Sequence, residues 1–200
     1  MEQKHSLQPG MRLHDQHGRR LYLNEQEREA FIAQAHKSPE PIRSFCLLLI
    51  YSGCRISEAT GISKQDILLG ERSVCLRTLK RRSKTEFRYV PVPSDVLELL
   101  TALVEAHDPQ RSYLFSAGQF PPPRVRAYRW VKSVMAELEL NGPNASPKGL
   151  RHTFGAHATL TGVQLQMLQR WMGHASMETT AIYATLIGKE EREIAKRMWK

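Results

Sequence analysis

The stretch that decides the fold stands late in the chain and reads Gly173-His174-Ala175-Ser176-Met177-Glu178-Thr179-Thr180-Ala181-Ile182-Tyr183. It places a tyrosine nine residues after a histidine. Two arginines precede it in separate segments: Arg55 follows Tyr51-Ser52-Gly53-Cys54, and Arg151 follows Lys148-Gly149-Leu150. Arginine forks bind phosphate oxygens bidentately, and a phenolic oxygen can attack the phosphorus between them. The four residues together indicate chemistry on a phosphodiester.

In their order along the chain and in their residues, these segments resemble the motifs of the tyrosine recombinase (phage integrase) family. The resemblance runs from about Leu23 to Tyr183 and rests on several separate motifs. It implies the integrase catalytic-domain fold, which is mainly α-helical with a small antiparallel β-sheet. It also implies a site-specific recombinase that cleaves and rejoins DNA through a 3′-phosphotyrosyl intermediate, in integration, excision, inversion or resolution, without metal, ATP or another cofactor.

The resemblance assigns a role to each residue that matches a family motif. Arg55 and Arg151 would bind the scissile phosphate and stabilise its pentavalent transition state. Tyr183 would be the nucleophile, and His174 would donate a hydrogen bond to a non-bridging oxygen. Glu58, three residues after Arg55, would support the site rather than react.

The general acid that protonates the departing 5′ oxygen is expected in a basic hairpin. The family places a lysine at the end of the first strand, which favours Lys80, because strand ends position groups better than turn tips. Lys84 lies in the same hairpin and competes for this role.

The second arginine motif departs from the usual His-x-x-Arg, since Lys148 occupies the histidine position. A lysine can hydrogen-bond a phosphate oxygen but exchanges protons less readily than imidazole near neutral pH. The departure puts a proton-transfer role for Lys148 in doubt. His152, beside Arg151, fits core packing or a supporting hydrogen bond better than chemistry.

The basic composition points to a polyanionic partner. The formal net charge is +9, which favours nucleic acid over a membrane surface. We predict double-stranded DNA as the partner, a homotetramer on synapsed sites as the family implies, and leave accessory DNA-binding proteins open. The predicted DNA contacts are Arg77, Arg81, Arg82, Lys84, Arg88, Arg124, Arg126 and Arg129.

The remaining composition fits a cytoplasmic protein associated with the nucleoid, from a bacterium or a mobile element. Cys46, Cys54 and Cys75 are an odd number without paired spacing, which favours free thiols in a reducing compartment. The longest apolar run, residues 45–51, is too short to cross a bilayer, and the N-terminus has no apolar signal segment.

Three regions are expected: a flexible basic arm over residues 1–20, the catalytic domain over 21–186, and a helical tail over 187–200 that docks on a neighbouring protomer. Many family members carry an N-terminal domain that completes a clamp around DNA. Only about twenty residues precede the catalytic region here, so the chain is either a recombinase of the catalytic domain alone or a piece of a longer protein.

Local patterns predict the elements of the central region. Asn24 and Glu27 form a capping box for a first helix, and an apolar second helix runs from Pro41 to Gly53. Strands are predicted at residues 73–79 and 86–92, and helices from Ser94 and over 124–140, 150–160 and 163–172. A last short helix begins at Ser176 and carries Tyr183.

Two other functions remain open: a type IB topoisomerase-like enzyme, which shares the chemistry without synapsis, and a non-catalytic DNA-binding regulator that kept the fold. The intact Arg55, Arg151, His174 and Tyr183 argue against the regulator, whereas Lys148 and the absent clamp argue mildly for it. Patterns for zinc binding, a phosphate-binding loop or a serine nucleophile elbow are lacking.

Overall fold

The computed structural model describes residues 12–78, 86–106, 112–116, 118–186 and 198–199. Its helices are α1 Glu25–Lys37, α2 Ile42–Ser52, α3 Ile56–Thr60, α4 Ser94–Glu105, α5 Arg124–Ala136, α6 Pro147–Leu160, α7 Leu165–Met172 and α8 Met177–Ala181, with short 3-10 segments η1 Lys64–Asp66 and η2 Ile182–Leu186. Its strands, β1 Ile67–Leu68, β2 Ser73–Thr78 and β3 Glu86–Pro91, form one antiparallel sheet in the order β1-β2-β3. The predicted fold class, mainly α with a small antiparallel sheet, is confirmed.

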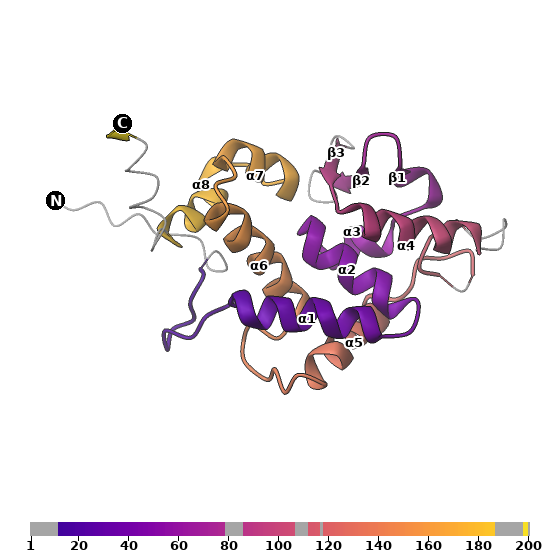
Figure 1. The fold of residues 1–200 in the computed structure, drawn as a ribbon, viewed down its shortest axis with the longest axis horizontal. Helices are drawn as coiled ribbons and strands as arrows, with labels where there is room; N and C mark the ends of the chain where they lie inside the picture. Colours follow the sequence, from indigo (N-terminus) through magenta and orange to yellow (C-terminus); the bar gives the residue numbers. More distant parts are fainter. Residues whose placement is uncertain (1–11, 79–85, 107–111, 117, 187–197, 200) are drawn as a thin grey trace.

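The helices divide into two groups that face each other. Figure 1 shows α6, α7 and α8 on one side and α2, α3, α4 and the sheet on the other, with α1 and α5 along the lower edge of this view. Helix α2 contacts α1, α4, α5 and α6, and residues 44–50 within it are all buried. It is therefore the central core helix that its apolar sequence predicts.

Helix α2 ends at a glycine that the fold needs. Gly53 has φ 60°, in the left-handed region, and a Cβ built there would lie 2.3 Å from the ring of Phe154. Only glycine suits this backbone and this close approach of α2 to α6. The chain then continues directly into Arg55, which precedes the first residue of α3.

Caps set the starts of α1 and α6. The Asn24 side chain accepts from the Glu27 backbone N–H at 2.8 Å, and the Glu27 carboxylate accepts from the Asn24 N–H at 2.8 Å, which confirms the predicted capping box. Helix α6 begins at Pro147, earlier than predicted, because the Ser146 hydroxyl accepts from the Gly149 N–H. Helix α5 ends at Ala136, earlier than predicted, and Glu139 beyond it has φ 54°.

The predicted flexible arm differs from the structure at residues 12–20. This segment makes a turn closed by the Leu21 N–H donating to the Leu13 carbonyl at 2.8 Å, and Leu13 is buried against α6 and α7. A single apolar residue in a polar stretch therefore ties this part to the domain. Most of the predicted tail, residues 187–197 and 200, lies outside the described residues.

The sheet is short and its faces are unequal. Strand β3 alternates, with Arg88 and Val90 buried and with Phe87 and Tyr89 exposed. In register, Arg88 pairs with Leu76 of β2. In the described part of the chain, no helix is long and apolar enough to cross a membrane.

Candidate active site

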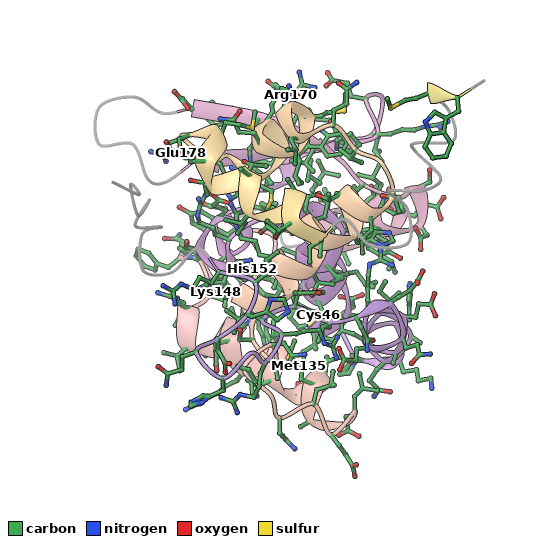
Figure 2. All side chains as sticks on the ribbon, turned by 90° about the vertical axis from the view of Figure 1, so that its left-hand side faces the viewer. Cys46, Met135, Lys148, His152, Arg170 and Glu178 are labelled. Carbon is green, nitrogen blue, oxygen red and sulfur yellow. The ribbon has the colours of Figure 1, made fainter. Side chains whose placement is uncertain are left out.

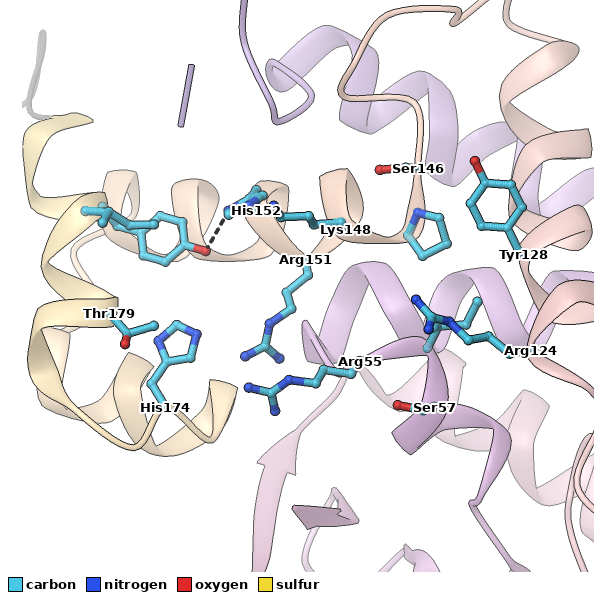
Figure 3. A pocket seen from close by; sticks show the side chains of 14 residues that line it. Arg55, Ser57, Arg124, Tyr128, Ser146, Lys148, Arg151, His152, His174 and Thr179 are labelled. Carbon is cyan, nitrogen blue, oxygen red and sulfur yellow. Dashed lines mark hydrogen bonds between the residues drawn. The ribbon is translucent and has the colours of Figure 1, made fainter. Parts of the chain in front are cut away.

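A cavity of about 640 Å³ opens between the two groups of helices (Figure 3). It brings together five residues that are predicted to be catalytic, Arg55, Lys148, Arg151, His174 and Tyr183. They come from the α2–α3 junction, α6, the α7–α8 junction and η2, so segments far apart in the sequence converge. The other two candidates, Lys80 and Lys84, lie outside the described residues.

Glu58 joins two arginines on one side of the cavity. Its side chain is 0% exposed, and its carboxylate accepts from the Arg55 guanidinium at 2.8 Å and from the Arg88 guanidinium at 2.6 Å. Burial raises the pKa of Glu58, but hydrogen bonds and charge from Arg88 and Arg55 outweigh burial, so its pKa is lowered overall. The carboxylate is therefore ionised at neutral pH and fixes both guanidinium groups.

The structure corrects the assignment of Arg88 to DNA contact. The residue is 5% exposed, and its guanidinium also donates to the Trp171 carbonyl at 2.7 Å and to the Thr78 hydroxyl at 3.1 Å. With its donors engaged inside the domain, Arg88 connects the sheet to α7 and to Glu58. The alternation of β3 predicts this position, because Arg88 shares the inward face with Val90.

Backbone carbonyls hold the second arginine of the cavity. Arg151 donates to the Gly53 carbonyl and to the Met172 carbonyl, each at 2.6 Å. Burial and the charge of nearby Arg55 lower the pKa of Arg151 to about 10, so it remains a cation at neutral pH. Figure 3 shows the Arg55 and Arg151 side chains next to each other, with His174 beside them.

His174 is a neutral imidazole in this setting. Its Nδ1 lies 2.9 Å from the Thr180 hydroxyl, in a hydrogen bond that fixes the ring. Burial, with the charges of Arg151 and Arg55, lowers the pKa of His174 to about 3. A neutral ring keeps one N–H and one lone pair, so His174 can donate a single hydrogen bond at pH 7.

Tyr183 lies in η2 and is 1% exposed. Its hydroxyl lies 3.1 Å from Nδ1 of His152, the contact drawn as a dashed line in Figure 3. Burial raises the pKa of the phenol well above its ordinary value, and the charge of Arg151 lowers it only in part. From the sequence, His152 was expected only to pack or to support the site, without a contact to the tyrosine.

The cavity continues past Lys148 toward α5. Lys148 is exposed in the first turn of α6, and Arg124 and Tyr128 line the far end of the cavity (Figure 3). Arg124 is one of the predicted DNA contacts, and its position in the cavity was not anticipated. Figure 2 shows Lys148 and His152 close together in a second view.

The other predicted DNA contacts fall into two groups. Arg77, Arg126 and Arg129 are exposed, as a phosphate contact requires. Arg81, Arg82 and Lys84 lie outside the described residues.

The three cysteines are free, and burial raises the pKa of each thiol, that of Cys54 to about 11. Protonated thiols are poor nucleophiles, so these residues pack rather than react. Among the described residues, no group of three or more His, Cys, Asp or Glu side chains is placed to hold a metal ion.

Fold and cavity together define an integrase-type catalytic domain. The chain belongs to the phage integrase family, whose family model matches residues 21–189. It is similar to a tyrosine recombinase of Thermosipho africanus, with 25% identity over 88% of this chain and 61% of the relative. It is also similar to the tyrosine recombinase XerC of Nitrobacter winogradskyi, with 34% identity over 68% of this chain and 43% of the relative.

Solved structures give the same fold. The XerH site-specific recombinase matches with a TM-score of 0.74 at 21% identity, over 89% of this chain and 53% of the other. The catalytic domain of bacteriophage HP1 integrase matches with a TM-score of 0.64 at 20% identity, over 88% of this chain and 93% of the other.

The chain spans roughly half the length of the curated relatives that it matches. Those relatives are named recombinases, so the topoisomerase-like and regulator alternatives are not favoured.

Proposed function

We propose that this chain is the catalytic domain of a site-specific DNA recombinase that cleaves DNA through a 3′-phosphotyrosyl intermediate. The observation that carries the proposal is the convergence of Arg55, Arg151, His174 and Tyr183 in one cavity. Two fixed cations and a neutral imidazole beside a phenol suit a phosphodiester, whose negative charge is shared by two non-bridging oxygens. Family membership supports the same chemistry.

In the proposed step the Tyr183 oxygen attacks phosphorus, and the bond from phosphorus to the 5′ oxygen breaks. Arg55 and Arg151 hold the non-bridging oxygens, and His174 donates to one of them. Because Glu58 and backbone carbonyls fix both guanidinium groups in advance, little reorganisation is needed when charge builds up on the phosphate. A 5′ hydroxyl from another DNA strand then reverses the step and releases the tyrosine.

The departing 5′ oxygen needs a proton from a general acid, for which Lys80 is our first candidate and Lys84 the second. Lys148 is proposed to hydrogen-bond the phosphate from the exposed start of α6. A 5′-phosphorothiolate at the scissile position replaces that oxygen by sulfur, which leaves without a proton. It should restore cleavage by Lys80→Ala. If cleavage by Lys84→Ala is restored instead, Lys84 is the general acid. If cleavage is restored in neither variant, neither lysine is the general acid.

Double-stranded DNA is the proposed partner. Similar structures include XerH bound to difH substrate and a Tn1549 transposon integrase in complex with circular intermediate DNA. Exposed Arg77, Arg126 and Arg129, with Arg124 in the cavity, are the proposed phosphate contacts among the described residues. We propose that residues 21–186 form the catalytic domain, and that residues 187–200 join protomers in a tetramer on paired sites.

The test uses DNA recovered as covalent adducts on the protein in cells, rebuilt as nicked half-site duplexes. Wild-type protein should form an adduct that survives denaturation. Tyr183→Phe should abolish the adduct and retain DNA binding, whereas Tyr128→Phe, which changes the other tyrosine lining the cavity, should leave it intact. An adduct undiminished in Tyr183→Phe would overturn the proposal.

A further inference from the structure

The buried hydroxyl of Tyr183 has one hydrogen-bond partner within the described residues, Nδ1 of His152 at 3.1 Å. Tyrosine and histidine are both buried, at 1% and 7% exposed, so bulk water is largely excluded from this contact. A phenol that attacks phosphorus must lose its proton. An acceptor for that proton must lie within hydrogen-bond reach of the buried hydroxyl.

The other groups lining this part of the cavity are poor acceptors. Arg151 is a cation that carries only donors, and the ammonium form of Lys148 likewise has no lone pair. His174 uses Nδ1 in its bond to Thr180, and its other ring nitrogen is the one that the proposed step leaves to donate to the phosphate. His152 is the described side chain whose lone pair can face the phenolic O–H directly.

The second ring nitrogen of His152 is informative. Nε2 is buried and has no hydrogen-bond partner among the described residues. Buried polar atoms without partners are rare, because they lose their contacts with water and gain nothing in return. If this position served only for packing, an apolar ring would avoid the cost of an unpaired buried nitrogen. The Nδ1 contact with Tyr183 therefore explains why a histidine occupies it.

Gly155 makes room for the tyrosine ring to reach His152. It lies one turn further along α6, and a Cβ built on it would lie 2.3 Å from the Tyr183 ring. Glycine in the middle of a helix is destabilising relative to alanine, which implies a specific need for the space. The tyrosine ring therefore packs against α6 at Gly155, with its hydroxyl at hydrogen-bond distance from His152.

We propose that His152 accepts the phenolic proton of Tyr183 as the oxygen attacks DNA, and that Gly155 is the residue that lets the ring reach it. This inference rests on the proposed function. The O–H bond breaks, its electron pair forms the bond from oxygen to phosphorus, and the proton moves to Nδ1. When a 5′ hydroxyl later displaces the tyrosine, the proton returns to the phenolic oxygen.

The charge around His152 fits this role. Burial, together with the nearby cations Lys148 and Arg151, lowers the pKa of His152 to about 4, so the free ring is neutral and ready to accept. The DNA phosphate between the arginines adds negative charge beside these cations. Bound substrate thereby raises the basicity of His152 at the moment when the proton is transferred.

The first experiment measures single-turnover adduct formation on a nicked half-site with a 5′-phosphorothiolate, from about pH 3.5 to pH 9, a range that includes the pKa of about 4 of the free His152 ring. His152→Asn keeps a hydrogen-bond acceptor near the Nδ1 position but cannot take the proton. We expect it to slow adduct formation by about 100-fold and to flatten the acid side of the pH profile. His157→Asn, on the same helix but outside the cavity lining, should match wild type.

Gly155→Ala should likewise slow adduct formation, and Gly70→Ala, where a Cβ meets nothing within 4 Å, is its control. A wild-type rate and pH profile in His152→Asn would overturn the inference. If Tyr183→Phe abolishes the adduct in that same assay, the proposed function stands and only the role of His152 fails.

A second experiment needs neither DNA nor a variant. In ¹⁵N NMR spectra of the wild-type protein, a ring that accepts from the phenol has its proton on Nε2 and a lone pair on Nδ1. That tautomer is the expected result at neutral pH. A proton on Nδ1 would mean that His152 donates to Tyr183, which contradicts the proposal.

Discussion

The two walls of the cavity hold their charges by different means. In the first, which we call the carboxylate wall, the buried Glu58 pairs with Arg55 and Arg88. In the second, the helical wall, the carbonyls of Gly53 and Met172 hold Arg151, while neutral His152 and His174 lie near Tyr183. The first wall depends on full charges, and the second on dipoles and on histidines that burial keeps neutral.

This difference teaches where each wall is vulnerable. Removal of the Glu58 carboxylate leaves a buried cation unpaired, which is among the most costly changes in a protein interior. Acidification spares that carboxylate until the pH is low, because its pKa is lowered. The helical wall is sensitive at milder pH, since its histidines must stay uncharged.

The largest expected effect is that of Glu58→Ala. It leaves Arg88, 5% exposed, without its carboxylate, and should lower the free energy of unfolding by about 3–5 kcal/mol. Arg43→Ala removes an ion pair with Glu40 whose side chains are 35% and 29% exposed, and it should cost at most about 1 kcal/mol. Urea denaturation monitored by circular dichroism measures both, and equal losses would show that the carboxylate wall is no stronger than a surface ion pair.

Mild acid should destabilise the helical wall before the carboxylate wall, with a smaller loss of stability than Glu58→Ala causes. The pKa of His152 is about 4 in the folded protein and about 6.5 for an unperturbed imidazole, so the unfolded chain takes up the proton first as pH falls. Stability should therefore drop between about pH 6.5 and 4, with about 2 kcal/mol lost to His152 by about pH 5. Burial and charge lower the pKa of His174 in the same direction.

Urea denaturation at about pH 7 and about pH 5 tests this, because the loss should be smaller in His152→Asn than in wild type. His17→Asn, which changes an exposed histidine, is the control. The depressed pKa of Glu58 acts in the same direction but at lower pH, since its contribution disappears only as pH falls through the folded value. A loss as large in His152→Asn as in wild type would show that His152 is not a source of this acid sensitivity.

The smallest effect concerns exposed and buried arginines in DNA binding. Each phosphate contact that is lost should reduce the log–log slope of affinity against salt by about 0.9. We expect this reduction for Arg124→Ala and no change for Arg88→Gln, measured under conditions where both variants are folded. If Arg88→Gln lowers the slope as Arg124→Ala does, then Arg88 contacts phosphate after all.

Local signals predicted much of the fold. The capping box at Asn24 and Glu27 fixed the start of α1, and the apolar run before Gly53 identified α2 as central. The two-residue strand β1 was missed, because a pair of residues gives no periodicity to read. The burial of Leu13 was missed because it depends on packing between the two ends of the chain.

The site was predictable where motifs are contiguous. Arg151, His174 and Tyr183 stand in recognisable segments, and the cavity brings them together as those segments suggest. Arg88 was misassigned because its basic neighbours outweighed the strand alternation that turns it inward. The contact between His152 and Tyr183 could not be predicted from the sequence. The two residues lie in different elements, α6 and η2, and only tertiary packing brings them together.

Our central proposal is that the phenolic oxygen of Tyr183, in a cavity with two fixed arginines, forms the covalent bond to DNA. The most direct measurement is digestion of the trapped protein–DNA adduct to peptides, followed by mass spectrometry of the peptide that carries the nucleotide. We expect the modification on Tyr183. Modification of Tyr128, or of any other residue in its place, would contradict it.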